Sequence, residues 1–117
     1  MSIACTIALA GLLVPVAIAL ALECPEPQAL AGPGILKETP AQTQRIADLL
    51  ATGDDDNRIR IIADDLRARY PGVQNAEIAN YLMAAYCPVV AKMSGVSEQE
   101  MQARMDRFVS QLSRIIY

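Results

Sequence analysis

The most reactive side chains in this 117-residue sequence are its three cysteines. Cys5 lies in an N-terminal apolar run, so Cys24 and Cys87 remain as an even pair for the rest of the chain. In an oxidising compartment such a pair is expected to form a disulfide. For a loop of this length, the lost chain entropy corresponds to about 4 kcal/mol of stabilisation. We therefore predict a Cys24–Cys87 disulfide.

Acidic residues gather in the stretch Asp54-Asp55-Asp56-Asn57. Clustered carboxylates suit hard cations such as Ca²⁺, and Asp54 and Asp56 match two ligand positions of an EF-hand loop. However, Arg58 and Ile59 occupy the third ligand position and the glycine position of that loop. We favour an acidic helix N-terminus that complements the helix dipole. We predict no metal site.

The chain contains no histidine. This excludes Ser-His-Asp and Cys-His catalysis within the chain, and it removes the commonest transition-metal ligand. The adjacent carboxylates of Asp64 and Asp65 would point in different directions on a helix, so they make a poor acid–base pair. We expect no catalytic residue and no cofactor, and we predict that the protein is not an enzyme.

Two of the four tyrosines, Tyr81 and Tyr86, lie in the most apolar stretch outside the N-terminal run. One interpretation is that they line a ligand pocket or a partner surface. The other is that they are core residues whose hydroxyl groups reach the rim. We favour the core for Tyr86, and less so for Tyr81, which lies off the main apolar stripe.

The net charge is −3 and lysine and arginine residues form no cluster. Nucleic-acid binding needs concentrated positive charge, and so does electrostatic attachment to a membrane surface. We therefore expect no nucleic-acid partner and no polybasic membrane patch.

Residues 1–22 carry no charged side chain. Ala19-Leu20-Ala21 is a small-x-small site of the kind that signal peptidase accepts. We therefore predict a signal peptide over residues 1–21 and a periplasmic or secreted location. The first basic side chain is only Lys37, and about 20 apolar residues suffice to span a bilayer. The alternative is an uncleaved inner-membrane anchor formed by residues 1–22.

Residues 22–38 are rich in helix breakers, namely Pro25, Pro27, Gly32, Pro33 and Gly34. Prolines and glycines at this density prevent a helix. We predict an extended arm that lies across the domain surface and is pinned at Cys24. A helical domain is expected over residues 39–117.

The first two helices of this domain have clear boundaries. Thr39-Pro40 begins the first, with Gln42 as partner in a capping box, and Gly53 should end it in a left-handed conformation. The second follows the acidic stretch and ends at Pro71-Gly72. Their apolar residues recur at intervals of three and four: Ile46, Leu49 and Leu50, then Ile59, Ile62, Leu66 and Tyr70.

The third helix should begin at Asn75, kink or break at Pro88, and end by Gly95. Ser97 and Glu100 form a capping box for the fourth, which runs to the C-terminus. Their apolar stripes contain Ile78, Leu82, Ala85, Tyr86, Val89, Val90 and Met93, then Met101, Met105, Phe108, Leu112 and Ile115. We assign the last stripe to the core, with a homodimer interface as the alternative.

No segment alternates apolar and polar residues for long enough to form a strand. We therefore predict an all-α fold, a small four-helix domain that follows an N-terminal signal or hydrophobic segment and a Pro/Gly-rich arm.

The run from Ala79 to Val90, followed by Ser97-Glu98-Gln99-Glu100 and the closing Ile115-Ile116-Tyr117, resembles a group of small exported bacterial proteins of unknown function. The likeness covers most of the chain after residue 21. It implies a secreted helical domain in the bacterial envelope. It implies no activity, ligand or catalytic residue.

These observations favour a small non-enzymatic periplasmic protein that binds an unknown protein partner as an interaction or accessory module. One alternative is an N-terminally anchored accessory subunit of an inner-membrane complex. Another is a binding protein for a small apolar ligand held near Tyr81 and Tyr86.

Overall fold

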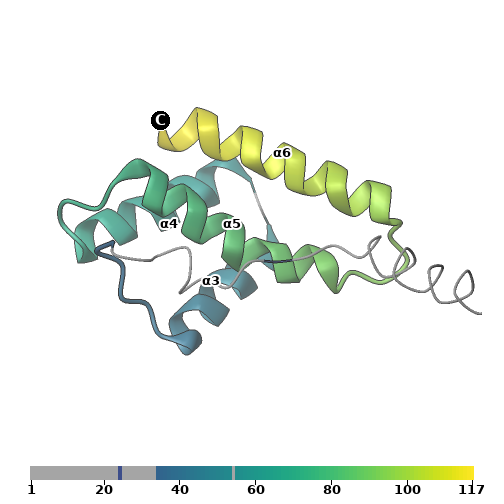
Figure 1. Cartoon of the computed structure of the whole chain (residues 1–117), viewed down its shortest axis with the longest axis horizontal. Coiled ribbons are helices and arrows are strands. Elements are labelled where there is room, and N and C mark those ends of the chain that lie inside the picture. The colour runs from purple at the N-terminus through teal and green to yellow at the C-terminus, as the bar shows by residue number, and fades with distance from the viewer. Residues whose placement is uncertain (1–23, 25–33, 54) are drawn as a thin grey trace, which may run out of the picture.

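The structure is a computed structural model, and it describes residues 24, 34–53 and 55–117. The predicted signal peptide and most of the predicted arm lie outside the described residues. The described residues form four helices and no strand, which confirms the all-α prediction. The helices are α3 (Pro40–Thr52), α4 (Asp56–Arg69), α5 (Asn75–Ala91) and α6 (Glu98–Ile116) (Figure 1).

The start of α3 is confirmed, but its end differs from the prediction. Thr39 Oγ1 accepts from the Gln42 N–H at 3.1 Å, and Gln42 Oε1 accepts from the Thr39 N–H at 2.7 Å. Gly53 has a φ of 176°, which is extended rather than left-handed, so that prediction was wrong. Instead, Arg58 Nη1 donates to the Leu49 carbonyl oxygen at 2.7 Å and satisfies one of the last carbonyls of α3.

The acidic stretch begins α4, in agreement with the favoured interpretation. Asp55 is the N-cap, and its Oδ1 accepts from the Arg58 N–H at 2.8 Å. Asp56 is the first helical residue, and its Oδ2 accepts from Arg114 Nη2 of α6 at 2.9 Å. The chain turns after α4 at Gly72, whose φ of +90° favours glycine.

Of the predicted kink or break at Pro88, the break does not occur, because α5 continues through Pro88 to Ala91. Pro88 lies in the last turn, so the N–H that it lacks costs α5 one hydrogen bond near its end. Packing against neighbouring helices then holds the turn. The predicted cap was also displaced by one residue: Gln74 is the N-cap and makes no side-chain capping bond, while Asn75 is already helical.

At the start of α6, the Ser97 Oγ accepts from the Glu100 N–H at 3.1 Å, as the capping box requires. The helix extends to Ile116, close to the predicted C-terminal end.

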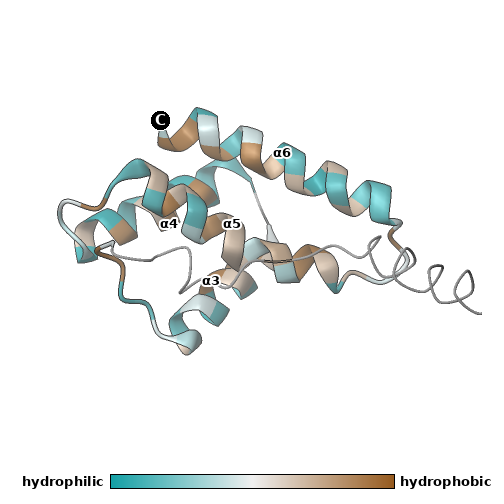
Figure 2. Cartoon of the chain, in the orientation of Figure 1, coloured by the Kyte–Doolittle hydropathy of each residue, from teal (hydrophilic) through white to brown (hydrophobic). Residues whose placement is uncertain are grey.

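The helices pack around α5. It contacts α3 and α6, while α4 contacts α6 and, less closely, α3. Figure 2 shows α5 as largely apolar, flanked by helices that carry hydrophilic residues. One connected core results, with contributions from all four helices: Ile46 and Leu50; Ile59, Ile62 and Leu66; Ile78, Tyr81, Leu82, Tyr86 and Val90; Phe108, Leu112 and Ile116.

Most predicted stripe residues lie in or against this core, including Met101 and Met105, which are partly buried against it. Leu49 and Met93 are the exceptions, since Leu49 is 44% exposed and Met93 is half-buried without packing against the core. At the described end of the arm, Leu36 is only 3% exposed and enters the core, while its neighbours Ile35 and Lys37 are exposed.

Candidate functional site

The predicted disulfide is confirmed. Cys24 and Cys87 are joined with an S–S distance of 2.09 Å and a Cα–Cα distance of 5.6 Å, and they stand 63 residues apart in the chain. The bond fixes Cys24 against the C-terminal half of α5. A disulfide persists in an oxidising, extracytoplasmic environment.

The two singled-out tyrosines are both buried, and each is 2% exposed. The Tyr86 ring stacks on Phe108 of α6 with 4.2 Å between ring centroids. The Tyr81 hydroxyl instead lies 2.8 Å from Thr43 Oγ1 of α3. These positions are those of core residues, and a role for the pair in ligand binding stays a prediction.

A polar cluster that the sequence did not predict is centred on Glu38, whose side chain is 2% exposed. Its members, which we call the Glu38 cluster, are Glu38, Thr43, Asp65, Arg69, Tyr70 and Tyr81. Arg69 donates to both Glu38 oxygens, at 2.7 Å and 3.0 Å. Tyr70 donates to Oε2 at 2.7 Å and Tyr81 to Oε1 at 3.4 Å. The last residue of the arm before the cap Thr39 is thus fixed between α4 and α5.

The electrostatics of the Glu38 cluster keep it in one protonation state at neutral pH. Burial raises the pKa of the Glu38 carboxyl, but hydrogen bonds from Arg69 and Tyr70 and the charge of Arg69 outweigh burial and leave the pKa below its usual 4.5. Burial raises the pKa of Tyr81 to about 12. Glu38 is therefore a carboxylate with both oxygens occupied, and it anchors the arm rather than serving as an acid or base.

A second carboxylate, that of Glu77, binds the arm two to three residues before Glu38. Glu77 Oε1 accepts from the Ile35 N–H at 3.1 Å, and Oε2 accepts from the Leu36 N–H at 2.7 Å. A Cβ at Gly34 would overlap the Glu77 carboxylate, so a larger residue there would displace this carboxylate from its position against the arm. Backbone and side-chain contacts together fix residues 34–38.

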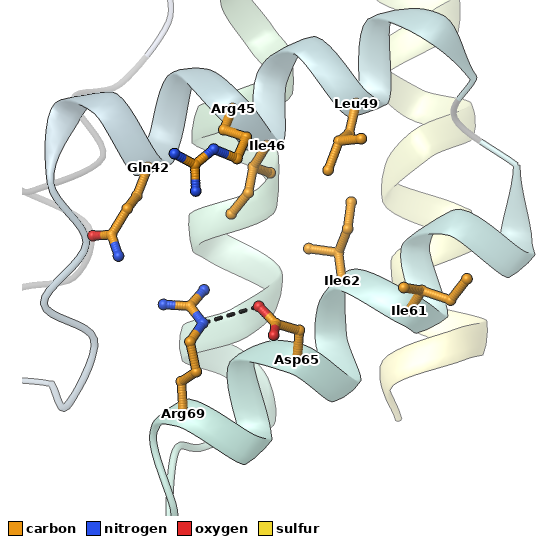
Figure 3. A pocket seen from close by; sticks show the side chains of 8 residues that line it. All are labelled: Gln42, Arg45, Ile46, Leu49, Ile61, Ile62, Asp65 and Arg69. Carbon is orange, nitrogen blue, oxygen red and sulfur yellow. Dashed lines mark hydrogen bonds and ion pairs between the residues drawn. The ribbon is translucent and has the colours of Figure 1, made fainter.

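An open groove lies between α3 and α4, with a volume of about 440 Å³. We call it the α3–α4 groove (Figure 3), and it is lined by Gln42, Arg45, Ile46, Leu49, Ile61, Ile62, Asp65 and Arg69. Its floor is apolar and buried, with Ile46 at 7% and Ile62 at 5% exposure. Its edges carry two exposed aliphatic side chains, Leu49 at 44% and Ile61 at 60%.

The groove also has charged residues, and they differ in their pairing. Asp65 Oδ2 accepts from Arg69 Nε at 2.9 Å, and Arg69 also binds Glu38. Arg45 is exposed and makes no hydrogen bond or ion pair with the described part of the chain. Among the described residues, the Arg45 charge is thus not paired with a carboxylate, and it lies beside an apolar floor.

Sequence reasoning missed this groove, although the sequence holds a signal for it. Leu49-Leu50 and Ile61-Ile62 are pairs of adjacent aliphatic residues, and neighbours on a helix point about 100° apart. On a helix with a narrow buried face, one member of such a pair faces the core and the other points to its edge. Leu50 and Ile62 are buried, and Leu49 and Ile61 face the groove.

Neither Tyr81 nor Tyr86 lines the α3–α4 groove, so the predicted ligand or partner residues and the observed groove are separate. Tyr81 is linked to it only indirectly, through Glu38 and Arg69.

Two kinds of feature are missing from residues 24, 34–53 and 55–117. Their His, Cys, Asp and Glu side chains form no group of three or more that could hold a metal ion. None of their helices is both long and apolar enough to cross a membrane. Comparisons of the chain with protein-family models, with curated proteins and with solved structures each found no match. The geometry of the described residues is therefore the basis for assigning a function.

Proposed function

We propose that this protein is a non-enzymatic docking module of the bacterial periplasm, and that a partner protein binds in the α3–α4 groove. The observation that carries the proposal is the exposure of Leu49 and Ile61 above a buried apolar floor. Covering these side chains would remove apolar surface from water, which is the main driving force of protein association. Such a patch is a common mark of an interaction site.

The disulfide supports the periplasmic location, because the cytoplasm keeps thiols reduced. The charge-free run of residues 1–21 and its small-x-small site support export by a cleaved signal peptide. The competing arrangement is an inner-membrane accessory subunit that keeps residues 1–22 as its anchor, with the groove presented to the periplasm.

The intact mass of the native protein from separated periplasmic and membrane fractions distinguishes these arrangements. We expect a soluble species that begins at Leu22 and lacks two hydrogens, because of the disulfide. A full-length species confined to the membrane fraction would instead establish the anchored subunit. A cytoplasmic species with free thiols would contradict both locations.

Docking at the groove is tested by site-specific photo-crosslinking in intact cells, with the full-length chain. A photoreactive residue replaces Ile61 in the groove or, as the matched control, Val109 on α6, an exposed aliphatic residue at 39%. We expect a discrete heavier adduct from position 61, lost when Leu49→Asp is introduced, and none from position 109.

Two results would contradict docking at the groove. One is the absence of an adduct from position 61 under conditions in which a free photoreactive probe labels the protein. The other is an adduct of twice the chain mass from position 109 alone, which would assign a homodimer through α6.

A further inference from the structure

The α3–α4 groove has two chemically different ends (Figure 3). At one end, the guanidinium groups of Arg45 from α3 and Arg69 from α4 point toward each other beside Gln42. At the other end lie the aliphatic side chains of Leu49 and Ile61. An occupant that fits both ends must itself carry an acidic end and an apolar end.

The pairing of the two arginines indicates which charge an occupant needs at the polar end. Arg69 is already bound by Glu38 and Asp65, with its Nη1 2.7 Å from Glu38 Oε2 and its Nε 2.9 Å from Asp65 Oδ2. Arg45 has no such carboxylate among the described residues. A carboxylate supplied from outside would pair with Arg45, and the planar guanidinium suits bidentate binding of that group.

The shape of the groove favours a protein segment over a small molecule. Small-ligand sites bury most of the ligand surface. Here the apolar end is open, since Leu49 and Ile61 are 44% and 60% exposed. An amphipathic helix laid lengthwise between two helices covers such an open trough and buries only one of its own faces.

We propose that the occupant of the α3–α4 groove is an acidic amphipathic helix of a partner protein, whose carboxylate binds Arg45 while its apolar side chains cover Leu49 and Ile61. This inference rests on the proposed docking function and specifies the partner's chemistry.

The spacing along α3 sets the pattern of the partner helix. Arg45 and Leu49 are four residues apart, or about 6 Å along the helix axis. A partner helix running beside α3 therefore carries Asp or Glu three or four residues from a large apolar residue, so that both lie on one face.

A displayed library of random helical peptides, panned against the full-length disulfide-bonded protein, tests the inference without a known partner. We expect enriched peptides to carry Asp or Glu three or four residues from Leu, Ile, Phe or Met. Binding of the best peptide is then measured by fluorescence anisotropy. Arg45→Glu should weaken binding at least tenfold, and Arg45→Gln by several-fold.

Two further variants complete the design. Ile61→Asp should abolish binding of the best peptide, while Arg107→Glu on α6 should leave it unchanged, because Arg107 is exposed and does not line the groove. Replacing the peptide's acidic residue by lysine should weaken binding to the wild type and restore it to Arg45→Glu. Circular dichroism confirms that each variant keeps its helical content.

The outcomes distinguish the proposal of an acidic partner helix from the broader proposal of docking at the α3–α4 groove. Enriched peptides that are neutral or basic and insensitive to Arg45→Glu, yet lost with Ile61→Asp, overturn the acidic partner and leave the docking function standing. If no peptide is enriched that depends on Ile61, both are overturned.

Discussion

The two sides of α5 are stabilised in different ways. Tyr86 faces α6, and its ring stacks on Phe108 at 4.2 Å in an interface built from apolar side chains. Tyr81 stands five residues earlier, about 140° around the helix. Its hydroxyl joins Thr43 of α3 and Glu38 of the arm, in a network that includes Arg69 of α4.

The difference shows that α5 is stabilised by apolar packing on one side and by a specific set of polar partners on the other. Apolar packing depends on volume and is indifferent to pH. A buried carboxylate depends on its partners, since burial without them costs several kcal/mol. The polar side therefore fixes the arm in one position and makes part of the stability depend on protonation.

The largest effect is expected on the apolar side. Phe108 is fully buried, so Phe108→Ala should lower the free energy of unfolding by about 4 kcal/mol through lost burial and a residual cavity. Urea denaturation measures this loss, and it should be the same at pH 7 and pH 4. Val109→Ala, at a 39% exposed neighbour, is the control and should change stability little. A loss that varies strongly with pH would show that the stability contributed by Phe108 is not due to apolar burial.

The next largest effect is expected from the Cys24–Cys87 disulfide, which attaches the arm to α5. Replacing both disulfide cysteines, by Cys24→Ser with Cys87→Ala, should cost about 3 kcal/mol, because measured values fall somewhat below the chain-entropy value for a long loop. Chemical reduction of the wild type should give the same free energy of unfolding in urea. Equal free energies of unfolding for the variant and the oxidised wild type would show that the disulfide does not stabilise the fold.

Removing the charge at the centre of the polar side should have a smaller effect. Glu38→Gln keeps the shape but leaves Arg69 with Asp65 as its carboxylate partner. Because Arg69 is 36% exposed, the expected cost is about 2 kcal/mol at pH 7, below the value for a fully buried pair. The pKa of Glu38 is lowered in the folded state, so its contribution is present above the usual 4.5 and is lost as pH falls below that value.

Urea unfolding of wild type and Glu38→Gln from pH 7 downward measures this contribution. The two curves should converge as pH falls below the usual pKa of 4.5, whereas the exposed-site control Glu98→Gln should follow the wild type throughout. A gap that persists at low pH would mean that the charge of Glu38 is not what stabilises the arm.

The smallest effect concerns the Tyr81 hydroxyl. Tyr81→Phe removes its 2.8 Å hydrogen bond with Thr43 and should cost about 1 kcal/mol. The pKa of Tyr81 is raised from 10.0 to about 12, so the unfolded chain loses this proton first and wild-type stability falls as pH rises from 10 towards 12.

That alkaline fall should be shallower in Tyr81→Phe and unchanged in Tyr117→Phe, since Tyr117 is 70% exposed. Thermal or urea unfolding between pH 8 and pH 11 gives the slopes. An unaltered slope in Tyr81→Phe would assign the alkaline loss to another group, with Tyr70 the first candidate because its pKa is also raised.

The candidate site shows where prediction from the sequence ends. The apolar stripe of α3 included Leu49 together with Leu50, yet only Leu50 is buried. A stripe defines a direction, but how far the neighbouring helix covers it depends on the distance and angle between helices. Since α3 and α4 pack less closely than α5 packs against α3 or α6, the edge of their stripes stays open.

Glu38 illustrates the same limit for polar residues. In the sequence it is one acidic residue between Lys37 and Thr39, with no periodicity to separate it from a surface residue. Its burial requires Arg69, Tyr70 and Tyr81, which stand 31, 32 and 43 residues away. No local pattern encodes contacts at that separation.

The sequence by itself determined the four helices, the caps at Thr39 and Ser97, and the pairing of Cys24 with Cys87. Capping and helical periodicity act within a few residues, and once Cys5 is assigned to the predicted signal peptide, the two remaining cysteines leave a single pairing. Only the tertiary structure decided that the arm ends in a buried carboxylate and that a groove opens between α3 and α4, in which Arg45 pairs with no carboxylate of the described residues. Both depend on which surfaces of distant helices meet, because burial and pairing are properties of the assembled chain.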